Sequence, residues 1–268
     1  MKEFFYASGN AGILDHILFK YSQFKYWRKN RRFRAAFPEF SIPPDYYLYE
    51  TYLADYEKYQ SDGLLAAKEI LEWTDAYCGQ PLHQILEWGC GVGRIVRHLP
   101  DMLPATTMIH ACDINQEMIA WDNKNLPGIQ FSAIDGLPPT AYPDKLFDLV
   151  FAISVLTHIQ CNEQVNWIRE IHRIMEPDGV FLFTTHGEKF IGQLSVHERK
   201  KMNESGYFTR SFKHKGHRMM TTYNEAGKLK ELISPLFRVL EFHDGKKDIA
   251  KTGGQDLWIV CKIQSSRR

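Results

Sequence analysis

The chain has 268 residues, a formal net charge of +1 and 44% hydrophobic residues, values typical of a soluble globular protein with one large core. A charge this close to zero provides no global attraction for nucleic acid, and no apolar run has the length needed to cross a bilayer. The amino terminus lacks the apolar core of a signal peptide, and the five cysteines form no C-x-x-C pair. We therefore expect a reducing, cytoplasmic compartment.

Residues 1–58 are rich in aromatic side chains and are interrupted by prolines. Between His16 and Pro38 there are seven lysines or arginines and no acid. One interpretation is a basic amphipathic helix, over about 20–34, that binds an anionic substrate or a membrane surface. The interpretation that we favour is a solvated helical face balanced by the acids of residues 39–75, because charge runs usually face water.

A tyrosine-rich run at 46–52 precedes a long helix that the sequence predicts over about 63–78. Tyrosine combines ring area with a hydroxyl group, which suits a pocket wall and equally suits ordinary packing. We expect residues 1–58 to form a helical, aromatic cap segment and residues 59–268 to form one α/β domain.

The most informative stretch is Ile-Leu-Glu-Trp-Gly-Cys-Gly-Val-Gly-Arg at 85–94. It predicts a strand that carries Glu87 near its end, then a tight glycine turn, then a helix that begins near Gly93. The exposed N–H groups of such a helix would face a ligand over the turn. Dinucleotide-binding folds favour G-x-G-x-x-G, whereas the spacing here is G-x-G-x-G with Arg94 in the sixth place. A glycine turn alone also fits a purely structural role.

Two further strand patterns end near acids. Residues 109–115 contain Asp113, twenty residues after Gly93, where a Rossmann-like fold binds a pair of ribose hydroxyls. A strand-end turn or a helix cap is the alternative for this aspartate. Residues 129–139 predict a third strand and its exit loop, which holds Asp135.

The rest of the predicted sheet follows in order. The nearly continuous apolar run 146–153 predicts a strand buried on both faces. Residues 167–179 predict an amphipathic helix that ends at a proline and a glycine, and 180–187 predict a fifth strand. Residues 237–242 and 256–262 predict a closing, hairpin-like pair.

The connection 187–223 is long and rich in lysine, arginine and histidine, and a helix is expected to begin near Tyr223. Connections of this length are usually functional lids or contain their own elements. Ligands of doubly wound sheets bind over the carboxyl ends of the strands. We therefore expect a lid insertion over the acceptor site, with a surface excursion as the alternative.

In this order and spacing, the patterns over roughly residues 60–262 resemble the motifs of class I S-adenosylmethionine-dependent methyltransferases. The resemblance rests on E-x-G-x-G-x-G at 87–93, on the acids that follow the next two strand patterns, and on Phe-Asp-Leu-Val at 147–150. Pro177-Asp178-Gly179 is a mild departure, because the family usually has Pro-Gly-Gly there. The resemblance implies an α/β fold with a seven-stranded, mostly parallel Rossmann-like sheet, helices on both faces and an antiparallel last strand. It also implies S-adenosylmethionine as cofactor and S-adenosylhomocysteine as its product.

Roles for single residues follow from the same resemblance. Glu87 would help to position the ammonium end of the methionine, and Asp113 would accept from the ribose hydroxyls. Asp135 would accept from the adenine amine, with an ordinary Asp-Gly turn as an equal alternative. The cofactor-binding residues implied are Glu87, Gly89, Cys90, Gly91, Gly93, Arg94, Asp113, Ile114, Ile134, Asp135, Ile153 and Ser154.

Methyl transfer from a sulfonium is a direct displacement, so positioning supplies much of the rate. A hydroxyl acceptor usually also loses a proton to a base, most often histidine. His158 follows the fourth predicted strand and His186 ends the fifth, so we expect one of them to act as this base. Hydrogen-bonded scaffolding is the alternative for each. No metal-ligand spacing is present, so no metal is expected.

These observations predict a methyltransferase that acts on an oxygen or nitrogen of a small-molecule acceptor. A nucleotide-dependent oxidoreductase is the alternative suggested by the same strand, turn and helix, and a non-catalytic module is another. A nucleic-acid methyltransferase would rest on the basic segment 20–34. However, Ser154-Val155-Leu156-Thr157 stands where amino-group DNA methyltransferases have N/D-P-P-Y/F, so we do not expect nucleic acid as a partner.

Overall fold

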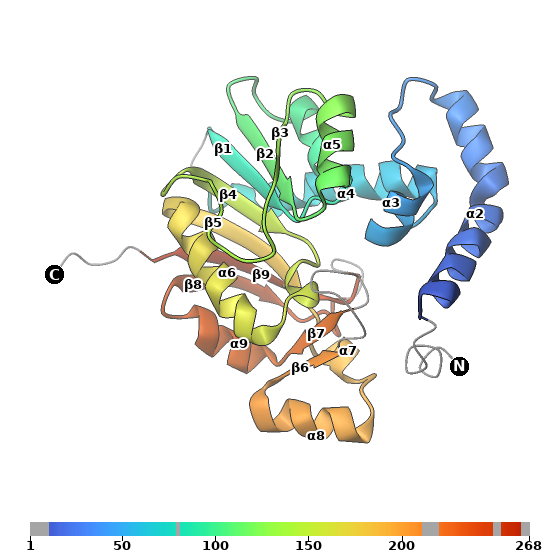
Figure 1. The fold of residues 1–268 in the computed structure, drawn as a ribbon. Coiled ribbons are helices and arrows are strands. Elements are labelled where there is room, and N and C mark those ends of the chain that lie inside the picture. The colour runs from blue at the N-terminus through green and yellow to red at the C-terminus, as the bar shows by residue number, and fades with distance from the viewer. Residues whose placement is uncertain (1–10, 79–80, 211–219, 249–252, 264–268) are drawn as a thin grey trace.

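The computed structural model describes residues 11–78, 81–210, 220–248 and 253–263, with side chains from residue 15 onward (Figure 1). A seven-stranded sheet forms its centre, in the order β3-β2-β1-β4-β5-β9-β8. The first five of these strands run parallel, and β9 is antiparallel to both β5 and β8. This is the predicted sheet. The strands are β1 (Gln84–Trp88), β2 (Met108–Asp113), β3 (Gln130–Ala133), β4 (Phe147–Ala152), β5 (Met175–Thr185), β8 (Phe237–His243) and β9 (Asp256–Lys262).

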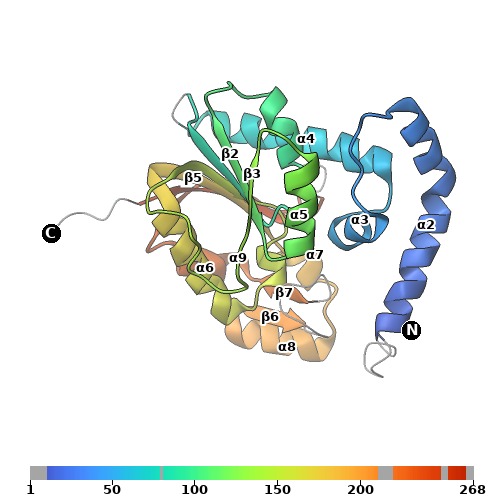
Figure 2. The same cartoon turned by 45° about the horizontal axis from the view of Figure 1, so that its top comes forward.

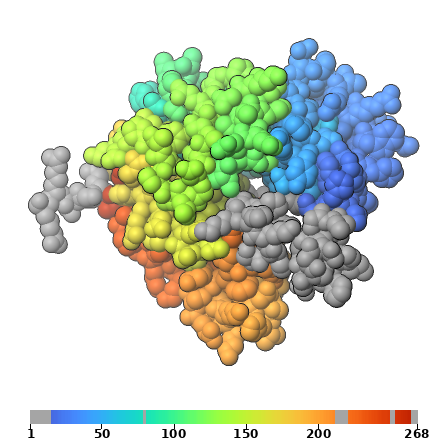
Figure 3. Space-filling model, viewed as in Figure 1, coloured from blue at the N-terminus to red at the C-terminus, as the bar shows by residue number. Residues whose placement is uncertain are grey.

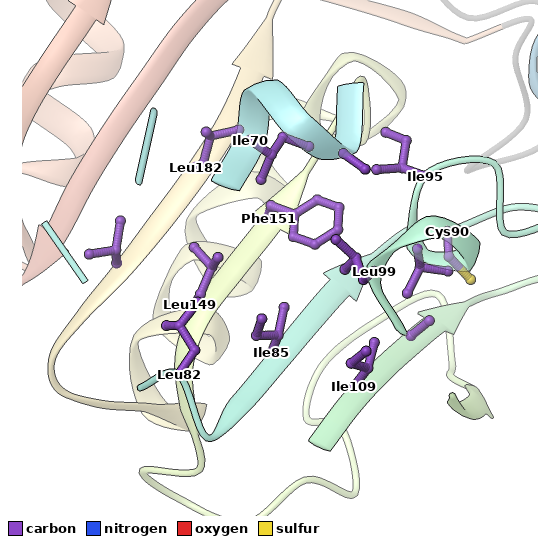
Figure 4. Packing of buried hydrophobic residues seen from close by; sticks show 14 of the residues in the cluster. Ile70, Leu82, Ile85, Cys90, Ile95, Leu99, Ile109, Leu149, Phe151 and Leu182 are labelled. Atoms are coloured by element: carbon purple, nitrogen blue, oxygen red, sulfur yellow. The ribbon is translucent and has the colours of Figure 1, made fainter. Parts of the chain in front are cut away.

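Alternation along the strands builds two cores, one on each face of the sheet. Ile85, Leu149 and Phe151 point to the face covered by α4 (Tyr56–Asp75) and α5 (Gln116–Asn125), as Figure 4 shows for part of this core. Leu86 and Val150 point to the opposite face, which is covered by α6 (Cys161–Ile174) and α9 (Ala226–Ile233). Because successive strand residues face opposite sides, a nearly continuous apolar run is what such a two-sided strand requires.

The segment after the glycine turn differs from the prediction. No α-helix begins near Gly93; irregular turns lead instead into a 3₁₀ helix, η1 (Val96–Asp101). Gly93 has φ +65°, which lies outside the right-handed helical region. Pro100 lies inside η1 and has no N–H with which to continue an α-helical ladder. The amides after the turn therefore take individual partners rather than those of a regular helix.

The N-terminal segment forms α2 (Ala11–Ala36) and α3 (Asp45–Thr51), with α2 at the outer edge of the molecule (Figures 1 and 2). Arg97 connects this segment to η1, because its guanidinium donates to the Ser41 carbonyl at 2.9 Å. The boundary expected at residue 58 falls inside α4, whose first turn packs in the same core as Phe33 and Leu48. The N-terminal segment and the sheet-bearing part thus share one continuous helix.

Residues 187–223 contain α7 (Glu188–Ile191), α8 (Val196–Ser205) and a small two-stranded sheet of β6 (Tyr207–Arg210) and β7 (Thr221–Asn224). Tyr223 belongs to β7, and the helix expected there begins at Ala226. The basic residues at 213–218 lie outside the described residues. In the described part of the chain, no helix combines the length and apolarity needed to cross a membrane.

Candidate functional site

A cavity of about 590 Å³ lies at the carboxyl ends of β1, β2 and β4. Its volume is that of a small-molecule site. Its walls come from the glycine turn, the start of α5, the loop after β4, the start of α6 and the end of α3. The residues that line it include Glu50, Thr51, Glu87, Gly89, Cys90, Gly91, Arg94, Asp113, Ile114, Glu117, Met118, Ile134, Ile153, Ser154, His158, Ile159, Glu163 and Trp167.

Two positions of the glycine turn can be occupied only by glycine. Gly89 and Gly91 have φ of +77° and +56°. A Cβ at Gly89 would lie 2.3 Å from Cγ2 of Val155, and one at Gly91 would lie 2.7 Å from Cγ2 of Thr51. Both the backbone conformation and the space therefore require glycine. The bare backbone gives a ligand in the cavity close access to the turn.

Asp113 is fixed at the end of β2 by backbone amides. Its Oδ2 accepts from Gly91 N at 2.9 Å, and its Oδ1 accepts from Asn115 N at 2.9 Å. Burial raises the pKa of Asp113, and these hydrogen bonds act in the opposite direction by favouring the charged form. A carboxylate oxygen has more than one acceptor site. The anchored carboxylate can therefore also accept from hydroxyl groups in the cavity.

Glu87 is 4% exposed and faces the cavity from β1. Its Oε2 accepts from Val96 N at 2.8 Å. Burial raises the pKa of Glu87 to about 8, although the nearby Arg94 guanidinium lowers it. At neutral pH this acid therefore holds a proton, which a bound cation would displace.

The N-terminal segment contributes part of the wall. Glu50 and Thr51, at the end of α3, line the cavity, and the Tyr47 hydroxyl donates to Glu117 Oε2 at 2.7 Å. Glu117 lies in the first turn of α5 and also lines the cavity. The tyrosine-rich run thus contacts the site, with Tyr47 holding α3 against the opposite wall.

His158 ends η2 (Leu156–His158) and lines the cavity with Ile159, Glu163 and Trp167. Its Nδ1 lies 2.7 Å from the Met220 carbonyl oxygen. Because a carbonyl oxygen only accepts, Nδ1 carries the proton of the neutral ring, and Nε2 is then the basic nitrogen. No described residue of 187–223 lines the cavity. The described part of this segment contacts the site through the Met220 carbonyl.

His186 does not line the cavity, whereas its neighbour Ser154 does. The Gln255 side chain joins the two, since its Nε2 is 2.7 Å from Ser154 Oγ and 3.5 Å from His186 Nε2. His186 Nδ1 is buried without a hydrogen-bond partner among the described residues. Burial lowers the pKa of His186 to about 4. Of the two candidate bases, only His158 faces the cavity.

Ten of the twelve residues expected to bind cofactor line the cavity, and Gly93 and Asp135 do not. Gly93 faces α5, where a Cβ would meet Leu126 at 2.5 Å. Asp135 is exposed, although Ile134 and Gly136 on either side line the cavity. Within the described ranges, no cluster of three or more His, Cys, Asp or Glu side chains could hold a metal ion.

The first turn of α5 is one part of the wall that sequence reasoning missed, and the start of α6 is another. Asn115 caps this helix, and its side chain accepts from the backbone N–H groups of Glu117 and Met118. The cap directs both residues toward the cavity immediately after Asp113. An Asp-x-Asn pattern at a strand end is the signal that could have indicated a helix start there.

Comparisons with known proteins agree with this geometry. Residues 86–183, from within β1 to within β5, match the family described as Methyltransferase domain. Over 116 residues the chain is 29% identical to Methyltransferase GfsG of Streptomyces halstedii, a match that spans 42% of this chain and 40% of that protein.

Two solved structures share the fold. A SAM-dependent methyltransferase from Methanosarcina mazei is similar with a TM-score of 0.57 and 20% identity, over 72% of this chain and 98% of that one. The 1,6-didemethyltoxoflavin-N1-methyltransferase of Burkholderia thailandensis, solved with S-adenosylhomocysteine, is similar with a TM-score of 0.52 and 15% identity, over 76% of this chain and 79% of that one. The chain therefore shares its fold with S-adenosylmethionine-dependent methyltransferases, and its segment from β1 to β5 matches the methyltransferase family in sequence.

Proposed function

We propose that this protein transfers the methyl group of S-adenosylmethionine to an oxygen or nitrogen atom of a small-molecule acceptor. The observation that carries the proposal is a single cavity lined both by the glycine turn and Asp113 and by His158 and Trp167. The acids and the bare backbone of the turn suit the cofactor, and the histidine and the apolar side chains of Ile159 and Trp167 suit an acceptor. The match of residues 86–183 to the methyltransferase family supports methyl transfer over a nucleotide-dependent oxidoreductase as the explanation of the turn.

Five residues would hold the cofactor. Gly89 and Gly91 would admit its methionine part to the backbone, Glu87 would face its ammonium group, and Asp113 would accept from its ribose hydroxyls. Ile134 would pack against the adenine, because it lines the cavity after β3. When bound, the cofactor supplies an electrophilic methyl group on a sulfonium.

His158 is the general base in this proposal. The Met220 carbonyl holds its Nδ1–H, so Nε2 can accept the proton that a hydroxyl or ammonium acceptor must lose. Ile159 and Trp167, which line the cavity with His158, would exclude water from around the acceptor and orient its ring or chain. The 1,6-didemethyltoxoflavin-N1-methyltransferase was solved with bound 1,6-didemethyltoxoflavin, which supports a small-molecule acceptor here. We also propose a cytoplasmic location, supported by five cysteines that all remain free thiols.

The test begins with calorimetry of S-adenosylhomocysteine binding to the full chain. Asp113→Asn places an amide where carboxylate oxygens accept two backbone N–H groups, so affinity should fall by about tenfold or more. The matched control is Gly136→Ala, which changes the same cavity at a position where an added Cβ meets nothing within 4 Å. Wild-type protein that does not bind S-adenosylhomocysteine would exclude the proposal.

The acceptor is then sought with isotopically labelled S-adenosylmethionine and a panel of small phenols, alcohols and amines. Transfer of label to a panel member, abolished by unlabelled S-adenosylhomocysteine, supports the proposed acceptor class. Transfer only to RNA or DNA would instead favour the nucleic-acid alternative.

A further inference from the structure

The outer face of α2 carries four large, exposed hydrophobic side chains. Ile17, Tyr21, Phe24 and Trp27 are 57%, 63%, 73% and 47% exposed. Their spacing of four, three and three residues places them on one side of the helix. Figures 2 and 3 show α2 at the edge of the molecule.

The fold does not account for this face. The opposite side of α2 attaches the helix through buried Phe19, Asn30 and Phe33. Asn30 donates to the Ala54 carbonyl at 2.8 Å, and the Phe19 ring packs on Tyr46 of α3 with centroids 5.2 Å apart. Exposed aromatic side chains grouped on one helix face commonly mark an interaction surface.

The same face is strongly cationic. Lys20, Lys25, Arg28, Arg31 and Arg32 are exposed, and among the described residues none of them forms an ion pair with a carboxylate. Lys29 is the member of the basic run whose ammonium group is neutralised, by Asp55 at 2.8 Å and Glu57 at 3.2 Å. The acids of residues 39–75 therefore balance one side of the helix and leave the outer face positive.

We propose that the outer face of α2 binds the surface of an anionic lipid membrane, with the helix axis parallel to that surface. Lysine and arginine are attracted to anionic headgroups, and aromatic rings favour the boundary between headgroups and acyl chains. Ile17 and Phe24 are hydrocarbon side chains that an acyl boundary accommodates and that a phosphate backbone does not use. Phe24, Trp27 and Arg31 also line a hollow beside Asp45 and Tyr56, so part of the face is concave. This inference goes beyond the proposed methyl transfer and does not depend on it.

The experiment uses flotation of the full chain with vesicles of phosphatidylcholine alone and of phosphatidylcholine mixed equally with phosphatidylglycerol. We expect binding to the anionic vesicles only, weakened by salt because a surface contact is screened. The triple variant R28E/R31E/R32E should bind at least about a hundredfold more weakly, since losing each cation at the surface costs roughly fivefold and each glutamate adds repulsion. The matched control is K200E/K201E/K230E, which makes the same change in charge at exposed lysines of α8 and α9.

A second variant separates the apolar contribution from charge. F24S keeps every charge and removes the most exposed ring of the face, so it should weaken vesicle binding while circular dichroism remains unchanged. Equal binding of the wild type to neutral and anionic vesicles, or an equal loss in the α2 and control triple variants, would overturn the proposal. Binding to single-stranded RNA with none to anionic vesicles would also overturn it.

Discussion

Replacing Asp122 with asparagine should make the stability of this protein less dependent on pH. Asp122 lies in α5 beneath the glycine turn and is completely buried. Neither carboxyl oxygen has a hydrogen-bond partner among the described residues. Burial raises the pKa of Asp122 to about 8, and the neighbouring carboxyl groups of Glu87 and Asp113 raise it further.

The sign and size of the effect follow from linkage. In the unfolded chain, an aspartate titrates near pH 4, whereas native Asp122 keeps its proton up to about pH 8. Between these values the native state binds more protons, so the free energy of unfolding falls as pH rises. One such group contributes a slope of about 1.4 kcal/mol per pH unit, or roughly 3 kcal/mol between about pH 5.5 and about pH 7.5. Asparagine has the shape of the protonated acid and removes this contribution.

Urea denaturation followed by circular dichroism across that range measures the slope. In Asp122→Asn, the part of the pH slope that Asp122 contributes should disappear. The part contributed by Glu87 should remain, because burial also raises the pKa of Glu87 to about 8. Asp101→Asn is the control, because Asp101 is an exposed carboxylate at the end of η1. The same slope in the wild type and in Asp122→Asn would refute the reasoning.

Three further outcomes are expected. Affinity for S-adenosylhomocysteine, measured by calorimetry, should rise by up to about tenfold per pH unit until about pH 8, because Glu87 loses its proton and its carboxylate then faces the ammonium group. Glu87→Gln should bind weakly at every pH. A wild-type affinity that does not change with pH would contradict this expectation. His158→Gln should lower kcat by about 10²- to 10⁴-fold at unchanged S-adenosylhomocysteine affinity, whereas full retained activity would exclude its role as base. Phe33→Ala should destabilise the N-terminal packing by about 3–5 kcal/mol and speed proteolysis of α2, and the exposed Phe24→Ala should not; equal digestion of both variants would count against this packing.

The sheet and most of the cavity could be predicted because their determinants are local in sequence. Buried parallel strands have to be apolar on both sides, and the acid and glycines at 87–93 lie in one short run. The carboxyl ends of neighbouring parallel strands meet at one edge, so Asp113 and Ser154 reach the same cavity without further information. The α-helix expected at Gly93 did not form for an equally local reason, since Pro100 would interrupt it about two turns later.

The contacts that were not predicted are long-range. Thr51 lies over Gly91 across forty residues of chain, and Met220 reaches His158 across sixty-two. Neither leaves a periodic pattern in the sequence, because each depends on how a whole segment packs. The β6–β7 sheet was not predicted, because its short strands pair with each other outside the seven-stranded sheet and lack the order and spacing that identified the strands of that sheet.

The position of Thr51 has a thermodynamic consequence. Because α3 forms part of the cavity wall, a ligand that contacts Glu50 or Thr51 gains affinity from the docked N-terminal segment. Linkage is reciprocal, so the same ligand must hold that segment in place by an equal free energy. Cofactor occupancy and the attachment of α2 and α3 are therefore two measurements of one coupling, and protection of α2 from proteolysis should report how full the site is.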